Sequence, residues 1–246
     1  MNLKDLRTSW EQFATDDPLW FILAAPGKQH AWQDGEFMET GRQEVATVLR
    51  AIEGMGVRLS RSRALDFGCG VGRLCQALGD HFGEVWGVDI SARMIELANA
   101  RNRHGDRVRY VLNDSDRLAA FAGGSMDFVY SNLVLQHMQP SFARGYLREF
   151  LRILAPGGMT VFQLPSHPTT RAYALRRGMR DRTPRNLIKA FHRVRYGSWK
   201  RAEIYGIEES RVVELLGRSG GEVLDVRPDD GAGGGWVSRK YFVRKR

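Results

Sequence analysis

The sequence is poor in cysteine and has no long apolar segment. It contains two cysteines, Cys69 and Cys75, which we expect to be reduced residues of a cytoplasmic protein rather than a disulfide framework. No run of 18 apolar residues occurs, so no transmembrane helix is predicted. Residues 1–5 show no apolar signal-peptide core. No spacing of Cys and His indicates a zinc site, and no metal is expected.

Acidic residues are nearly missing from residues 166–201. This segment has nine Arg and two Lys against one acid, Asp181, and carries a charge of +10, whereas the whole chain of 246 residues carries +9. The remainder is therefore nearly neutral, and residues 166–201 are interpreted as a basic insert. The length and a hydrophobic content of 43% suit one large α/β domain with an elaboration, or at most two domains.

Apolar runs that predict strands alternate with amphipathic segments that predict helices. Strands are expected at 63–67, 84–89, 107–112, 126–131, 159–164, 222–227 and 236–243, and helices near 39–56, 74–78, 91–98, 142–154 and 207–217. This order predicts a mostly parallel, doubly wound α/β sheet with helices on both faces. The domain is expected to span 41–246, with a helical basic insert, and residues 1–40, rich in Trp and Phe, to form a cap or lid.

A glycine-rich turn links the first predicted strand to the next helix and reads Asp66-x-Gly68-x-Gly70-x-Gly72. Glycine permits positive φ and lets a ligand lie against bare backbone, while free N–H groups of the helix N-terminus can face that ligand. A dinucleotide fingerprint needs its third glycine one residue later, where Arg73 stands. The turn therefore indicates a bound nucleoside but speaks against a dehydrogenase.

Acidic residues follow the next two predicted strands, where ligands of such sheets bind. Asp89 lies 17 residues after Gly72 and can accept both hydroxyls of a ribose; as a lone residue it would instead be read as a helix cap. Asp114, followed by Ser115, can accept a hydrogen bond from an adenine amino group, and the alternative is a solvated turn residue.

Five segments occur in the order typical of one enzyme family: 65–72, 85–91, 113–114, 126–137 and 151–158. Together they resemble the successive motifs of class I S-adenosylmethionine-dependent methyltransferases, over about residues 63–165. The resemblance implies a Rossmann-like seven-stranded sheet with strand 7 antiparallel. It also implies S-adenosyl-L-methionine as the cofactor, S-adenosyl-L-homocysteine as its product, and a small-molecule type of methyltransferase.

The resemblance also implies roles for single residues. The glycines would pass the backbone along the cofactor, Asp66 would order its amino-acid end, Asp89 would bind the ribose and Asp114 would face the adenine. Arg42 is a further candidate, to cover the cofactor's carboxylate. The full set of implied cofactor residues is Asp66, Phe67, Gly68, Cys69, Gly70, Gly72, Asp89, Ile90, Met94, Asp114, Ser115, Asn132 and Leu133.

Methyl transfer by in-line displacement chiefly requires that nucleophile and methyl group be held in line. A base is needed only if the acceptor keeps its proton near neutral pH. His137, just beyond the fourth predicted strand, is the first candidate; the alternative is a histidine that packs the strand–helix junction. His167 and His30 are secondary candidates, and Tyr130 could orient an acceptor.

The basic insert leaves several acceptor classes open. It could be a solvated helical pair, a collar for an anionic acceptor, a peripheral membrane-surface helix or an RNA-binding segment. The Asp/Asn-Pro-Pro-aromatic motif of amino-methylating enzymes is absent after strand 4, and so is a Pro-Cys nucleophile. O- or N-methylation of an anionic small molecule, sugar, or carrier- or lipid-linked acceptor therefore ranks above RNA methylation. A non-catalytic scaffold with the same fold is the remaining alternative, and the oligomeric state is not predicted.

Overall fold

The computed structural model describes residues 2–170 and 203–246. Three helices come first: α1 (Leu3–Asp16), α2 (Pro18–Ile22) and α3 (Asp34–Gly54). Strands and helices then alternate, as the periodicity of the sequence predicts. They are β1 (Arg63–Phe67), α4 (Arg73–Gly79), β2 (Glu84–Asp89), α5 (Ala92–Ala100), β3 (Val108–Leu112), β4 (Met126–Ser131), the short 3₁₀ helix η2 (Leu135–His137), α6 (Pro140–Ile153), β5 (Leu154–Pro168), α9 (Glu209–Arg218), β6 (Gly221–Asp229) and β7 (Trp236–Lys245).

The seven strands form one sheet in the order β3-β2-β1-β4-β5-β7-β6. Neighbours from β3 to β5 are parallel, whereas β7 is antiparallel to both β5 and β6. This confirms the predicted doubly wound sheet and its antiparallel seventh strand. The strand order reverses between β1 and β4, and ligands of open α/β sheets bind at such a reversal, beyond the carboxyl ends of the strands.

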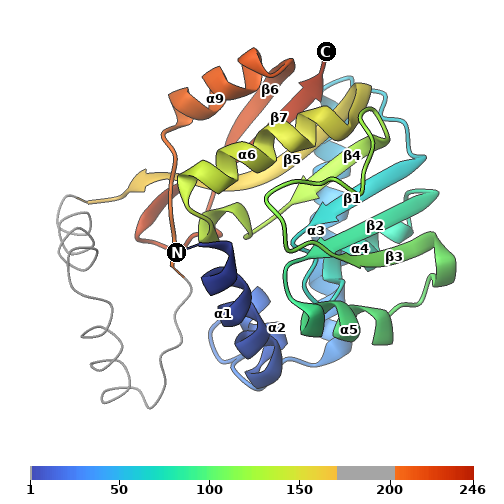
Figure 1. Ribbon diagram of the computed structural model, residues 1–246, viewed down its shortest axis with the longest axis vertical. Coiled ribbons are helices and arrows are strands. Elements are labelled where there is room, and N and C mark those ends of the chain that lie inside the picture. Colours follow the sequence, from blue (N-terminus) through green and yellow to red (C-terminus); the bar gives the residue numbers. More distant parts are fainter. Residues whose placement is uncertain (1, 171–202) are drawn as a thin grey trace.

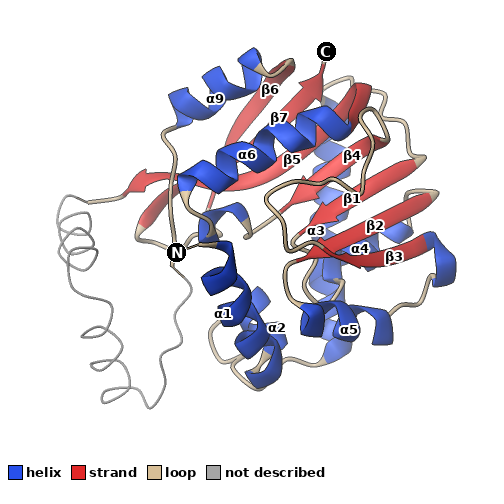
Figure 2. Cartoon of the chain, viewed as in Figure 1, coloured by secondary structure: helices blue, strands red, loops and turns tan. Residues whose placement is uncertain are grey.

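Helices cover both faces of the sheet, because successive side chains of a strand point to opposite sides. On β1, Leu65 packs in the cluster that contains α6 and α9, while Ala64 packs in the cluster that contains α3 and α4. Figure 1 shows α6 and α9 in front of the sheet and α3 and α4 behind it. Figure 2 shows the same layers by type of structure, with the strands between the helices.

Some element boundaries differ from the predicted ones. The helix before β5 ends at Ile153, and β5 begins at Leu154 rather than at residue 159. Gly157 and Gly158 therefore lie inside the strand. The last helix begins at Glu209, two residues later than expected. The basic insert lies, from residue 171 on, outside the described residues. No helix of the described part is long and apolar enough to cross a bilayer.

One close backbone contact joins α3 to α4. A Cβ atom on Gly41 of α3 would lie 2.5 Å from the carbonyl oxygen of Arg73 at the start of α4. A backbone oxygen cannot swing away as a flexible side chain can, so only glycine fits at this crossing. The contact sets how closely α3 approaches the glycine turn.

We expect Gly41→Ala to destabilise the protein by about 1–3 kcal/mol, because the added methyl group overpacks this contact. The control is Gly145→Ala in α6, where a Cβ meets nothing within 4 Å; there the better helix propensity of Ala should raise stability by about 0.5–1 kcal/mol. Urea denaturation of both variants measures the two shifts. Equal stabilisation by both substitutions would contradict the packing constraint at Gly41.

Candidate functional site

The glycine turn follows β1 directly and has left-handed backbone at all three glycines. Their φ angles are 77° at Gly68, 53° at Gly70 and 88° at Gly72, a region that side chains with a Cβ rarely adopt. The N–H of Gly68 donates to the Val88 carbonyl at 2.8 Å, which ties the turn to the end of β2. The turn thus presents bare backbone at the carboxyl edge of the sheet.

Asp89 ends β2 beside this turn, and both of its carboxylate oxygens are engaged by backbone. Oδ2 accepts a hydrogen bond from the Gly70 N–H and Oδ1 accepts one from the Ser91 N–H, each at 2.9 Å. Burial raises the pKa of Asp89 to about 6, against the opposing effect of these hydrogen bonds. Each oxygen keeps a further lone pair with which it can accept a ligand hydroxyl.

A pocket of roughly 650 Å³, its open mouth included, extends from the turn along the ends of the central strands. Its lining is mainly apolar, and Asp89 is its one acid. Trp10 and Ile22, from the N-terminal helices, form part of the wall opposite the sheet. The lining residues are Leu6, Trp10, Ile22, Phe67, Gly68, Gly70, Val88, Asp89, Ile90, Asn113, Asn132, Leu133, Val134, His137, Met138 and Tyr146.

The N-terminal helices are fastened over the pocket by polar contacts. Glu11 of α1 accepts hydrogen bonds from the backbone N–H groups of Ala92, at 2.7 Å, and Arg93 at the start of α5, where a carboxylate also complements the helix dipole. Arg7 pairs with Asp114 at 3.2 Å. Ile22 lies so close to the turn that a Cβ on Gly70 would be 2.6 Å from its Cδ1 atom.

The pocket brings together eight of the residues singled out in the sequence: Phe67, Gly68, Gly70, Asp89, Ile90, Asn132, Leu133 and His137. Leu133 has a φ of 62°, which is strained for a residue with a branched side chain. Such strain persists only where the surroundings impose it, and a Cβ on Gly231 would lie 2.5 Å from Cδ2 of Leu133. The loop between β6 and β7 therefore packs against this wall of the pocket.

Other candidate residues lie elsewhere. Asp66 is fully buried beneath the turn, where its Oδ2 accepts a hydrogen bond from the Cys75 thiol at 3.1 Å and burial raises its pKa to about 7. Asp114 is exposed in its pair with Arg7. Arg42 is exposed and pairs with Glu39 at 3.2 Å. Also outside the pocket lining are Cys69, Gly72, Met94, Ser115, Tyr130 and His167.

His137 lies in the pocket wall at the end of a chain of side-chain amides. Its Nδ1 hydrogen-bonds to the Glu203 carbonyl at 2.9 Å, and a carbonyl only accepts, so Nδ1 carries the proton. Its Nε2 then accepts from the Gln136 amide at 3.2 Å, and Gln136 in turn accepts from Gln163. Burial lowers the pKa of His137 to about 4, so the imidazole is neutral at pH 7.

Two of the other candidate catalytic side chains, Tyr130 and His167, are engaged away from the pocket. Tyr130 is buried, and its hydroxyl donates to Glu44 at 2.6 Å. His167 is exposed near the end of β5, with its Nδ1 3.1 Å from the Ser166 hydroxyl. Among residues 2–170 and 203–246, no cluster of three or more His, Cys, Asp or Glu side chains is arranged to hold a metal ion.

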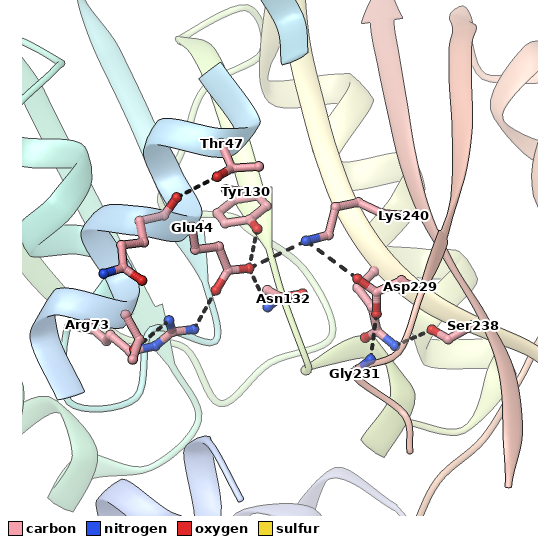
Figure 3. Close-up of polar contacts among 12 residues, drawn as sticks. Glu44, Thr47, Arg73, Tyr130, Asn132, Asp229, Gly231, Ser238 and Lys240 are labelled. Atoms are coloured by element: carbon pink, nitrogen blue, oxygen red, sulfur yellow. Dashed lines mark hydrogen bonds and ion pairs between the residues drawn. The ribbon is translucent and has the colours of Figure 1, made fainter. Parts of the chain in front are cut away.

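Glu44 of α3 is the centre of a buried polar cluster behind the pocket, shown in Figure 3. Its carboxylate accepts hydrogen bonds from Arg73 at 2.9 Å and from Tyr130 and Asn132 at 2.6 Å each, and Lys240 lies 3.5 Å away. Burial opposes the charge, but Arg73, Lys240 and these hydrogen bonds outweigh it and lower the pKa of Glu44. Glu44 belongs to no motif of the sequence; the only signal is a charge near the apolar face of a helix.

Residues 65–162 match the family model described as a methyltransferase domain. This part of the chain is therefore similar to a methyltransferase domain. The chain is 35% identical over 125 residues to the demethylmenaquinone methyltransferase of Staphylococcus saprophyticus, a match that covers 49% of this chain and 52% of that protein. The Staphylococcus haemolyticus enzyme of the same name is 36% identical over 112 residues, 44% of this chain and 45% of that one. The chain thus spans about half the length of the curated relatives it matches.

Solved structures share the fold of this chain. One is the magnesium protoporphyrin IX methyltransferase of Synechocystis PCC 6803 with bound SAH. The match covers 100% of each chain, with a TM-score of 0.66 at 18% identity. An S-adenosylmethionine-dependent methyltransferase from Clostridium acetobutylicum covers 81% of this chain and 89% of its own, with a TM-score of 0.58 at 14% identity. The fold is therefore the Rossmann-like one of class I methyltransferases, as the motifs indicated.

The buried, neutral His137 predicts a dependence of stability on pH. Its pKa is lower in the folded chain than the 6.5 of an unfolded one, so the unfolded state binds the extra proton between about pH 6.5 and pH 4, and stability is lost as the pH falls through that window. Protonation of the raised groups Asp66 and Asp89 acts in the opposite direction. The contribution of His137 must therefore be read as a difference between variants.

We expect the loss of stability from about pH 7 to about pH 5 to be smaller in His137→Asn than in the wild type, by on the order of 2 kcal/mol. Asparagine keeps a donor for the Glu203 carbonyl but does not titrate. Urea denaturation at both pH values measures this double difference. The same pH dependence in both proteins would show that His137 titrates normally.

Proposed function

We propose that this protein transfers a methyl group from S-adenosylmethionine to a small-molecule acceptor. The proposal rests on one pocket at the strand reversal in which three features lie together. They are the bare backbone of Gly68 and Gly70, the Asp89 carboxylate and an apolar wall. The glycine backbone and the Asp89 carboxylate suit a nucleoside that lies against the turn. The apolar wall can contact an uncharged surface of the acceptor next to the nucleoside.

The proposed cofactor fits the donors and acceptors that are present. Asp89 has lone pairs left for the ribose hydroxyls, and Ile90, which lines the pocket, offers an apolar surface to the base. The adenine end lies near Asn113 and Tyr146, whose side chains hydrogen-bond to each other at 3.2 Å. The bound cofactor supplies an electrophilic methyl group on a positively charged sulfur.

In the proposed reaction, a lone pair of the acceptor forms the bond to the methyl carbon while the carbon–sulfur bond breaks and its electrons return to sulfur. The protein's part is to hold acceptor and methyl group in line and to exclude water. The acceptor's proton leaves to a base or to solvent. We propose that His137 lines the acceptor space as a neutral imidazole, with its proton held on Nδ1 by the Glu203 carbonyl and its Nε2 lone pair engaged by the Gln136 amide.

The acceptor class is inferred from the lining and from the relatives. The relatives' names state demethylmenaquinone as their substrate, and the structural neighbour's states magnesium protoporphyrin IX, both small molecules with large apolar parts. Leu6, Trp10 and Met138 give this pocket a similar apolar character. An anionic group on the acceptor, or contact with a membrane surface, would depend on the basic residues of 166–201.

The direct test is calorimetric titration with S-adenosylhomocysteine. We expect the wild type to bind it and Gly70→Val to lose binding at least about 100-fold, because a side chain at this left-handed position fills the cradle and meets Ile22. Circular dichroism of the variant serves as the control for folding. If the wild type shows no binding, the proposed function is wrong.

The raised pKa of Asp89 predicts how this affinity changes with pH. The ionised carboxylate offers the most acceptor capacity, so affinity should fall by about tenfold for each pH unit below about 6. Asp89→Asn should bind more weakly at all pH values and show little of this dependence, which separates Asp89 from Asp66 nearby. Titrations at about pH 7.5 and pH 5 are compared; an unchanged wild-type affinity would contradict the assignment.

A further inference from the structure

We propose that Glu44 is a positioning residue for cofactor binding: it orients the Asn132 amide so that Oδ1 accepts a hydrogen bond from the α-ammonium group of S-adenosylmethionine. This inference rests on the proposed function. Glu44 itself does not line the pocket, whereas Asn132 does. Glu44 therefore acts through Asn132.

The first step is that Glu44 fixes which end of the amide faces it. A carboxylate without a proton can only accept hydrogen bonds, and Arg73 and Lys240 beside it keep it in that form. The Asn132 amide must therefore turn its NH₂ group toward Glu44, and the two atoms are 2.6 Å apart. The reversed amide would set two acceptor oxygens against each other with no donor between them, which is unfavourable for groups shielded from water.

The second step concerns the other end of the same amide. With Nδ2 held by Glu44, Oδ1 is directed away from it, and this atom is buried without a hydrogen-bond partner among the described residues. Buried acceptors are nearly always satisfied in native proteins. An unsatisfied oxygen on a residue of the pocket wall therefore indicates a donor that arrives with the ligand.

The third step is the place of Asn132 along the sheet. Asp89 ends β2 and Asn132 follows β4, with β1 between them. At a spacing of about 4.8 Å between neighbouring strands, the two lie on the order of 10 Å apart along the sheet edge. If the ribose of a ligand binds Asp89 and the chain that follows the ribose crosses Gly68, the amino-acid end of the ligand reaches β4. The donor on that end is the α-ammonium group.

The remaining contacts of Glu44 explain why it can hold this position. Arg73 is itself buried, with 4% of its side chain exposed, and also donates to Thr40 at 3.2 Å. The hydroxyl of Tyr130, in β4, donates a hydrogen bond to Glu44. Partners from α4, β4 and β7 thus surround one carboxylate, as Figure 3 shows. Glu44 cannot rotate away from Asn132 without breaking the other contacts.

The test compares two ligands that differ in the group concerned. S-Adenosylhomocysteine carries the α-ammonium group, whereas 5′-methylthioadenosine has the same nucleoside and thioether without the amino-acid end. We expect Glu44→Gln to weaken binding of S-adenosylhomocysteine by about tenfold or more, because glutamine can turn its own NH₂ group toward Asn132 and reverse the amide. Binding of 5′-methylthioadenosine should change by less than about twofold.

Two further variants keep the test decisive. Asn132→Leu removes the oxygen directly and should show the same selective loss, even if Glu44→Gln proves too unstable to measure. Glu53→Gln is the matched control: it makes the same change in α3 at an exposed carboxylate that pairs with Arg61 at 2.6 Å, and it should bind both ligands as the wild type does. All are titrated as the full chain, well below their melting temperatures.

The outcomes separate the inference from the proposed function. A wild type that binds neither ligand refutes the proposed function. If the wild type binds both, and Glu44→Gln and Asn132→Leu leave the affinity for S-adenosylhomocysteine unchanged or weaken both ligands equally, then Glu44 does not position an acceptor for the ammonium group and the inference is wrong. A loss confined to the ligand with the ammonium group supports it.

Discussion

The largely buried carboxylate of Glu44, whose side chain is 17% exposed, is the constraint on which the geometry of the site depends. An ionised group taken out of water is stable only if charges and donors surround it, and here they come from α4, β4, the residue after β4, and β7. Because these elements are distant in sequence, the carboxylate fixes their relative positions at the edge of the sheet. Lys240 extends the same arrangement to Asp229, 3.5 Å away, whose Oδ1 accepts from the Gly231 N–H, and so reaches the loop that packs on Leu133.

The parts that could be read from the sequence are those governed by short-range rules. Strand and helix order follows from periodicity and the glycine turn from its spacing, and the structure confirms both. The ion pair of Glu44 and Arg73 could not be read in this way. Nothing local distinguishes Glu44 from Arg42, two positions earlier, which is exposed; only the packing of α3 on α4 decides which one faces the interior.

The chemistry of the pocket is shaped as much by what is neutral as by what is charged. His137 is uncharged because it is buried, and its tautomer is set by a backbone carbonyl rather than by an acid. The chain from Gln163 through Gln136 to His137 gives each amide one fixed direction. Such a wall can receive an apolar surface without leaving a charge unpaired, while the acid of the pocket stays at the opposite end, in Asp89.

The described residues on either side of positions 171–202 are held by contacts with other parts of the fold. On one side Thr169 donates its N–H to the Gly235 carbonyl at 3.1 Å; on the other, Glu203 is held by His137, and the Tyr205 N–H donates to the Gln136 carbonyl at 2.7 Å. The first anchor lies where β5 meets β7, and the second includes His137 of the pocket wall. Sequence between them can therefore change in the course of evolution without moving either anchor, so that a chain of this design could acquire a different acceptor while keeping its methyl donor.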